Sequence, residues 1–169
     1  MVLCFFLINL VFYGKSMAIK QIKANINLLA ILDGFMGTLG HLISSSLSFL
    51  SESGTVMFMG IVCATACFFM QLVQFMEMSR FLELILMSSI SLTAPVIYNF
   101  LNIIFFKIYR IEERPLPTLL TNLIGKVGAF AAVYLVEFLP HYIFLSFGAI
   151  AVSLVGLSDK LRVMLPKEK

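Results

Sequence analysis

Residues 81–106 read FLELILMSSISLTAPVIYNFLNIIFF, a run of 26 residues with one charged side chain, Glu83. A helix needs roughly 20 apolar residues to cross a hydrocarbon core of about 30 Å, so this stretch predicts a transmembrane helix. One side of the run is nevertheless polar, with residues spaced by three or four positions: Ser88, Ser91, Pro95, Asn99 and Asn102. That spacing aligns side chains on a helix. Because polar groups are costly against lipid, the stripe is expected to face protein or a water-filled path.

The composition of the whole chain agrees with a membrane setting. Of its 169 residues, 60% are hydrophobic and 12% are charged, with a mean hydropathy of +1.01. Soluble domains average about 45–50% apolar and about 25% charged residues. The net charge of +3 is accounted for by basic loops at a membrane surface, so the expected surroundings are a lipid bilayer and not a nucleic acid.

Apolar runs divide the chain into five or six expected spans joined by short loops. Four runs are long and two are shorter: 27–50, 56–76, 81–106 and 116–138, then 2–13 and 142–157. The run at 2–13 has no basic residue before it and no small-x-small pattern after it, which favours a short first helix over a cleaved signal peptide. We therefore expect an all-α helical bundle forming one transmembrane domain over 1–158, followed by a short basic tail over 159–169.

Basic residues gather in three places, and these should orient the helices. They are residues 15–23, residues 107–114 and the tail. Lys and Arg in short loops favour the cytoplasmic side of a membrane. Three expected spans separate the first group from the second, so the rule cannot hold for both unless a re-entrant segment precedes Phe106. We expect the loop at 107–114 and the tail on the cytoplasmic side, and leave the first loop unassigned.

The other long runs also carry a face of small or polar residues. These are Asp33, Gly37, His41, Ser44 and Ser48 in the first, Gly60, Ala64, Cys67, Gln71 and Gln74 in the second, and Thr118, Thr121, Gly125, Ala129 and Ala132 in the last. Small residues let helices approach closely, so the simplest interpretation is a set of packing surfaces. Gly37, Gly60, Pro95 and Gly125 are the expected packing or hinge positions.

Six polar side chains exceed what packing requires and are candidates for lining a solute path: Asp33, His41, Gln71, Gln74, Asn99 and Asn102. Asp33 and His41 are separated by about 12 Å along a helix, too far for contact but close enough for a bridging water or solute. Proton coupling through them is one hypothesis, and ordinary helix contacts are the other. Lys126, about ten residues into its run, needs a charge partner, for which Asp33 is a candidate.

Enzyme motifs are missing from the sequence. Cys63 and Cys67 are one helical turn apart, but neither histidine lies at a spacing that completes a zinc site. There is no Gly-x-Ser-x-Gly elbow, no His-Glu-x-x-His and no phosphate-binding loop. We expect no enzymatic activity, no metal and no cofactor.

Residues 62–136 combine several features in a definite order. A helix ends at Phe75 and a tight turn follows; then come SLTAPV at 91–96, IEER at 111–114 and AAVYLV at 131–136. This order resembles half of a drug/metabolite transporter, of the EamA-like and nucleotide-sugar branches. Ile111 and Glu112 stand where that family has a glycine before its turn, and Lys126 interrupts the next helix.

The resemblance implies a cytoplasmic turn at 111–114 and an arrangement in which full-length members resemble two five-helix units. This chain would then be one unit, a fragment, or one partner of a homodimer. A solute site would lie between two copies near the membrane midplane.

Two classes of function remain open. The first is a transporter, or half-transporter, that moves a small polar metabolite by alternating access, with Asp33, Gln71 and Asn99 facing the path. The second is a non-transporting subunit or assembly factor of a larger membrane complex, in which the stripes only hold helices together. A fragment of a lipid-linked glycan flippase is a weaker third alternative. Dry packing of Asn99 and Asn102 against another helix would favour the second class.

Overall fold

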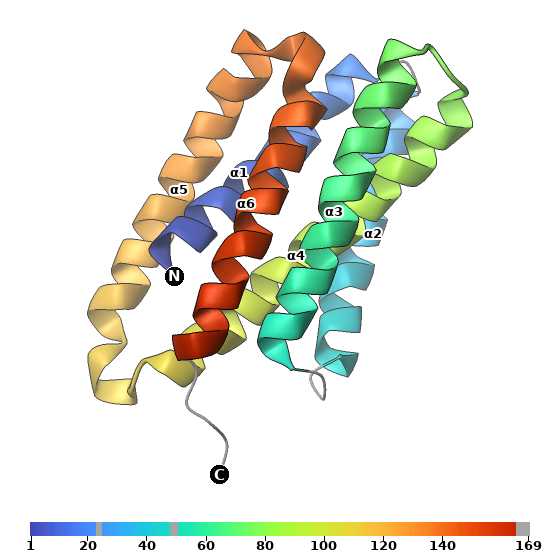
Figure 1. The fold of residues 1–169 in the computed structure, drawn as a ribbon. Helices are drawn as coiled ribbons and strands as arrows, with labels where there is room; N and C mark the ends of the chain where they lie inside the picture. Colours follow the sequence, from blue (N-terminus) through green and yellow to red (C-terminus); the bar gives the residue numbers. More distant parts are fainter. Residues whose placement is uncertain (23–24, 48–50, 165–169) are drawn as a thin grey trace.

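Six long helices make up the computed structural model, which describes residues 1–22, 25–47 and 51–164 (Figure 1). The helices are α1 (Val2–Ala18), α2 (Ile26–Ser46), α3 (Glu52–Phe75), α4 (Arg80–Ile108), α5 (Pro115–Phe138) and α6 (Ile143–Met164). Short 3-10 turns lie in three connections: η1 (Ile19–Gln21), η2 (Ile111–Glu113) and η3 (Pro140–Tyr142). In the described residues, six helical segments are long and apolar enough to cross a membrane. This confirms the all-α class and the multi-pass membrane location, with six candidate spans.

The two runs that look short in the sequence belong to longer helices. α1 continues through Lys15 to Ala18, and η1 extends the helical segment to Gln21. α6 continues past Leu157 to Met164, so the first residues of the expected tail are helical. Residues 165–169 lie outside the described part of the chain. Both helices therefore continue beyond the apolar runs expected from the sequence, at 2–13 and 142–157.

Local chemistry explains where several helices begin. The side chain of Asn25 accepts a hydrogen bond from the backbone N–H of Asn27 at 3.0 Å, and Ser79 accepts one from Phe81 at 3.3 Å. Such caps satisfy backbone donors that the first turn of a helix leaves free. α5 begins with Pro115, at a position where the missing N–H of proline costs nothing.

The turn between α3 and α4 is tight. Glu77 adopts a φ of 48°, a left-handed conformation that is uncommon for a residue with a side chain. The N–H of Met78 donates to the carbonyl oxygen of Val73 at 3.1 Å, which closes the end of α3. This closure reverses the chain within a few residues, so α4 packs directly beside α3.

Successive helices alternate in direction (Figure 1). η1, the α3–α4 turn and η3 lie at the upper end of the view, whereas the α4–α5 connection and the end of α6 lie at the lower end. At that lower end Lys107 Nζ of α4 is 2.5 Å from Glu52 Oε1 of α3. The first basic loop and the loop at 107–114 are therefore at opposite ends of the bundle.

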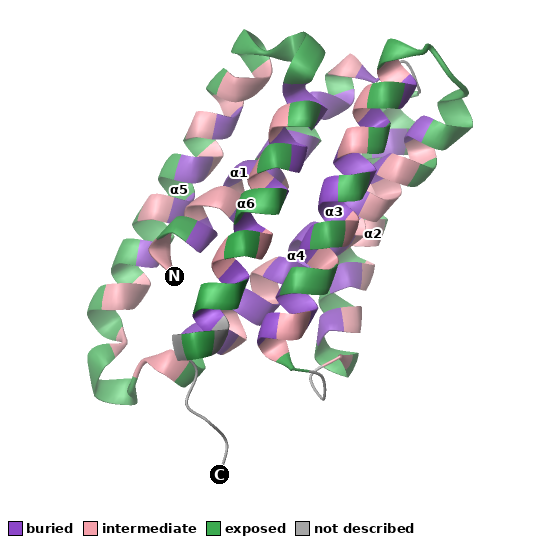
Figure 2. Cartoon of the chain, in the orientation of Figure 1, coloured by how far each residue is buried: buried purple, intermediate pink, exposed green. Residues whose placement is uncertain are grey.

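α1 and α4 form the centre of the bundle. α1 contacts α4, α5 and α6, and α4 contacts α1, α2 and α3. In the apolar stretches of α1 and α4 that could span a membrane, 50% of each stretch is buried. The corresponding share is 11% for α2 and 22% for α5. The outward faces are exposed (Figure 2) and carry large apolar side chains such as Phe35, Phe69 and Phe130. An apolar exterior of this kind suits contact with lipid.

Candidate functional site

Asp33 of α2 is held by side chains from two other helices. Its Oδ1 accepts a hydrogen bond from Ser91 Oγ of α4 at 2.5 Å, and its Oδ2 accepts one from Ser16 Oγ of α1 at 2.9 Å. Lys15 of α1 forms an ion pair with Oδ1 and also donates to Ser91 Oγ at 3.3 Å. We call Lys15, Ser16, Asp33 and Ser91 the Asp33 cluster. Because the two opposite charges meet, each offsets much of the cost of placing the other inside a membrane bundle.

The loop position expected for Lys15 is wrong. Lys15 lies within α1 and its side chain is 3% exposed. The candidate pairing of Asp33 with Lys126 is not formed, since the ammonium beside Asp33 belongs to Lys15. With Lys15 buried, only Lys20 and Lys23 remain in the first loop, and Lys23 lies outside the described residues. With fewer basic residues, the first loop conflicts less with the rule that Lys and Arg favour cytoplasmic loops. The helices alternate in direction without a re-entrant segment in the described residues.

The glycine before Lys15 lies where α1 and α6 approach closely. A Cβ atom on Gly14 would lie 2.5 Å from Cζ of Phe147, so a side chain there would collide with α6. Glycine thus permits α1 to approach α6 closely where α1 also contacts α4. Gly14, Lys15 and Ser16 thus lie within α1, which continues the apolar run.

His41 and Asn99 form a second polar contact between α2 and α4. His41 Nδ1 and Asn99 Nδ2 are 2.9 Å apart, and Asn99 Nδ2 also donates to Ser44 Oγ at 2.6 Å. Ser44 in turn donates to the carbonyl oxygen of His41 at 2.7 Å. We call these three residues the His41 cluster. Asp33 and His41 thus each contact α4 and are not joined to one another by any described side chain.

Between the two clusters the backbones of α2 and α4 approach closely at Gly40. A Cβ atom on Gly40 would lie 2.6 Å from the carbonyl oxygen of Leu92 and 3.3 Å from Cβ of Pro95. The stripe on α4 therefore divides: Ser91, Pro95 and Asn99 face α2, whereas Ser88 and Asn102 donate to carbonyl oxygens of their own helix. Ser48, the last member of the stripe on α2, lies outside the described residues.

Gln71 and Gln74 line a cavity of about 780 Å³ at the upper end of the bundle, which we call the upper cavity. Its wall comes from η1, the end of α3, the start of α4 and η3: Gln21, Gln71, Gln74, Phe75, Glu77, Met78, Arg80, Glu83, Pro140, His141 and Tyr142. Gln71 Nε2 donates to the carbonyl oxygen of His141 at 2.7 Å, and Gln71 Oε1 accepts from the N–H of Leu145 at 3.2 Å. Gln71 therefore ties α3 to the start of α6.

Two polar atoms in the wall of the upper cavity are buried without a hydrogen-bond partner among the described residues. They are Nε2 of Gln74 and Oε1 of Gln21. The side chain of Glu83 is also buried in this wall. Sequence reasoning missed Gln21 and Glu83, since neither lies on one of the recognised stripes. Of the six candidate residues, the fold thus places Gln71 and Gln74 together, Asp33, His41 and Asn99 along the contact between α2 and α4, and Asn102 apart.

The expected packing positions lie in different surroundings. A Cβ atom on Gly60 would lie 2.7 Å from Cγ2 of Val155, where α3 meets α6, and one on Gly125 would lie 2.9 Å from Nδ2 of Asn9, where α5 meets α1. A Cβ atom on Gly37 would meet nothing within 4 Å beyond the neighbouring backbone of its own helix. Cys63 and Cys67 are buried, and within the described residues no group of three His, Cys, Asp or Glu side chains could hold a metal.

No family model, curated protein or solved structure matches this chain. The resemblance of residues 62–136 to the drug/metabolite transporter superfamily therefore rests only on the order of sequence features within those residues. A transport function for this chain is a proposal.

Proposed function

We propose that the chain is a carrier, or half of a carrier, for a small polar metabolite, and that the solute enters the upper cavity. The observation that carries the proposal is the Gln74 amide, whose Nε2 is buried in the cavity wall without a partner among the described residues. A buried donor left unsatisfied costs about 1–3 kcal/mol. A solute that supplies an acceptor would remove that cost, so the cavity is better suited to a polar molecule than to a hydrocarbon.

The size and chemistry of the upper cavity support a small solute. Its volume of about 780 Å³ falls within the range of about 300–1,000 Å³ that ligand pockets occupy. Gln74 offers a donor, Gln21 an acceptor and Glu83 a carboxylate, while Arg80 adds a guanidinium. This mixture of donors and acceptors fits a solute with several hydroxyl or amide groups.

Alternating access needs a site that is reached from one side at a time. The upper cavity is lined by the α3–α4 turn, η1 and η3, all at the same end of the bundle (Figure 1). The bonds from Gln71 to His141 and Leu145 close one edge of it. Rearrangement of these bonds would change access to the cavity without disturbing the clusters between α2 and α4.

A non-transporting membrane subunit is the second candidate. It is favoured by the His41 cluster, in which Asn99 contacts α2 directly. It is also favoured by the outer face of α2, where Gly34 and Gly37 have nothing within 4 Å of their Cβ positions. In that function a helix of another subunit would cover α2. This candidate leaves the buried amide of Gln74 and the size of the upper cavity without an explanation, so we rank it second.

Binding of polar solutes to the purified protein tests the proposal. Cys4, Cys63 and Cys67 are buried, so reaction with a thiol-reactive dye reports unfolding in phosphatidylcholine nanodiscs. A panel of sugars, nucleosides, nucleotide sugars and amino acids is screened for a rise in Tm. We expect at least one solute to stabilise the protein and the Asn102→Leu control, whose altered side chain is not in the cavity wall, but not Gln74→Leu.

Solute exchange in proteoliposomes then separates a carrier from a binding subunit. The stabilising solute should exchange across the membrane with the protein and Asn102→Leu, and much more slowly with Gln74→Leu. Stabilisation that is the same in Gln74→Leu would refute a site at the upper cavity. Obligate co-purification with other subunits, without solute exchange, would establish the second candidate instead.

A further inference from the structure

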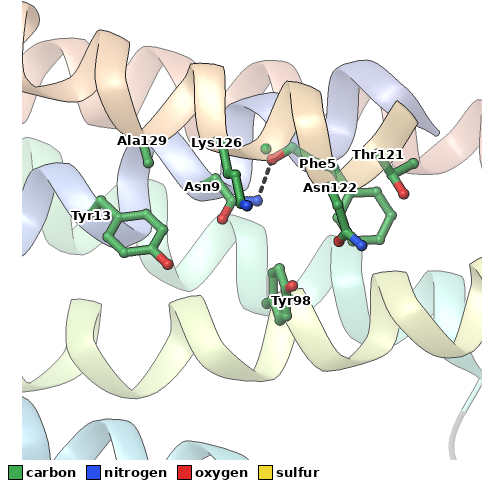
Figure 3. Close-up of a pocket in the computed structure, with 9 residues that line it drawn as sticks. Phe5, Asn9, Tyr13, Tyr98, Thr121, Asn122, Lys126 and Ala129 are labelled. Atoms are coloured by element: carbon green, nitrogen blue, oxygen red, sulfur yellow. Dashed lines mark hydrogen bonds between the residues drawn. The ribbon is translucent and has the colours of Figure 1, made fainter. Parts of the chain in front are cut away.

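A second cavity, of about 230 Å³, lies where α5 faces α4 beside α1 (Figure 3). We call it the Lys126 pocket. It is lined by Phe5, Asn9 and Tyr13 of α1, Tyr98 of α4, and Thr121, Asn122, Gly125, Lys126 and Ala129 of α5. Asn9 and Lys126 both line it, and Asn122 extends from α5 toward Tyr98 (Figure 3). It shares no residue with the upper cavity.

Lys126 is deep within its span. It lies eleven residues after Pro115 in a helix of 24 residues, about 16 Å from the first turn. An ammonium ion at such a depth is costly unless it is paired or hydrated. Lys15, which is buried in α1, meets this requirement through Asp33. Lys126 forms no ion pair or hydrogen bond with the described residues, so its ammonium is available to a bound group.

Several polar groups surround Lys126, and three of them lack a hydrogen-bond partner among the described residues. The hydroxyls of Tyr13 and Tyr98 and the amide of Asn122 form no hydrogen bond with the described residues. Asn9 Nδ2 donates to the carbonyl oxygen of Phe5 at 2.7 Å, which fixes its side chain at the pocket wall. No acidic residue lines the pocket. The pocket therefore offers one positive charge and several hydroxyl or amide donors at its edge.

Gly125 keeps this space open. A Cβ atom there would lie 2.9 Å from Nδ2 of Asn9, so a larger residue would push α5 away from α1 or displace the Asn9 side chain. Lys126 and Asn122 are exposed, whereas Asn9 and Tyr98 are half-buried. Because Lys126 and Asn122 are exposed, the pocket is reached from outside the bundle.

We propose that the Lys126 pocket binds an anionic carboxylate or phosphate group, which supplies the counter-charge of Lys126 and accepts hydrogen bonds from Tyr98 and Asn122. An ammonium is an effective point charge for phosphate, and hydroxyl donors add direction to the contact. A volume of about 230 Å³ accommodates the anionic group, while the rest of the ligand extends outside. The group belongs either to a soluble anion or to the headgroup of an anionic lipid, since the chemistry that holds it is the same.

Two probes distinguish these sources. Inorganic phosphate is titrated into the full chain in phosphatidylcholine nanodiscs, and in the other arm the nanodiscs contain phosphatidic acid. Tm is followed through the buried cysteines, and lipid retained by the protein is counted by native mass spectrometry. Stabilisation by phosphate identifies a soluble anion, and stabilisation only by phosphatidic acid identifies a lipid.

The matched pair of variants is Lys126→Met and Lys20→Met, because Lys20 is an exposed lysine outside the pocket. Lys126→Met should weaken binding of the effective probe by about ten- to hundred-fold, the usual worth of a hydrogen bond to a charged group. Lys20→Met should bind as the unaltered chain does. Tyr98→Phe, which removes one hydroxyl and keeps the ring, should weaken binding several-fold and serves if Lys126→Met fails to fold.

Equal binding by Lys126→Met and the unaltered chain would overturn the proposal, and so would the absence of stabilisation by both probes. Gln74→Leu should retain anion binding, because Gln74 does not line this pocket. A failure of the upper cavity to bind a solute therefore leaves the result for the Lys126 pocket unaffected.

Discussion

His41 of α2 lies against Asn99 of α4 at a separation of 58 residues, and Asp33 contacts Ser91 at the same separation. Equal separations mean that α2 and α4 run in the same direction with one register. The two contacts are about 12 Å apart along the helices. Since α2 packs chiefly against α4, these contacts and the close approach at Gly40 hold α2 to the rest of the bundle.

Loss of the charge on Asp33 should destabilise the bundle strongly. In Asp33→Asn the ammonium of Lys15 stays buried without its counter-ion, which costs about 3–5 kcal/mol in buried pairs. The double variant Lys15→Met/Asp33→Asn should be more stable than Asp33→Asn alone, because no unpaired charge remains. Unfolding followed by cysteine accessibility measures both differences. Equal stability of Asp33→Asn and the unaltered chain would show that the ion pair does not hold these helices.

Gly40 should not tolerate a side chain, whereas Gly37 should. Gly40→Ala places a Cβ atom 2.6 Å from a backbone oxygen of α4, so the helices must separate, at about 1–3 kcal/mol. Gly37→Ala meets nothing within 4 Å and should be neutral or stabilising by up to about 1 kcal/mol, since alanine is the better helix former. Thermal unfolding of the two variants side by side provides the comparison. A loss in Gly37→Ala as large as in Gly40→Ala would contradict the close contact.

Asn99 should contribute more to stability than Asn102. Asn99→Leu removes contacts to His41 and Ser44 on another helix, and interhelical hydrogen bonds in membranes average about 0.6 kcal/mol, with a maximum near 1.7 kcal/mol. Asn102→Leu removes only a bond to the carbonyl oxygen of Tyr98 in the same helix. The difference in Tm between the two leucine variants measures the worth of the His41 cluster. A larger loss in Asn102→Leu would contradict the assignment.

The two ends of the bundle should lie on opposite sides of the membrane. The α4–α5 connection carries Arg110 and Arg114, so that end is expected to be cytoplasmic. In bacterial cells an impermeant maleimide should label Met78→Cys from outside, and should label Glu113→Cys only after lysis. The three natural cysteines are buried, which keeps the background low. Labelling of both variants in intact cells would contradict six alternating spans.

Hydrophobicity and helical period could be read from local sequence, and they predicted most of the architecture. The run at 81–106 becomes α4, lengthened by one residue at its start and two at its end. The stripe on it does face another helix at Ser91, Pro95 and Asn99. Its outer members, Ser88 and Asn102, instead bond to their own backbone. The spacing of polar residues shows which of them share a face of the helix. It does not show how far a neighbouring helix extends along that face.

The sequence by itself determined that this chain forms membrane-spanning helices and that a carboxylate at Asp33 needs compensation, because burial of charge is costly in any apolar medium. Only the tertiary structure decided that Lys15 supplies it and that Lys126 does not. That choice depends on α1 continuing past Tyr13 and on the crossing of α1, α2 and α4. The upper cavity and the Lys126 pocket arise in the same way, since each is bounded by side chains from segments far apart in sequence whose meeting no local pattern encodes.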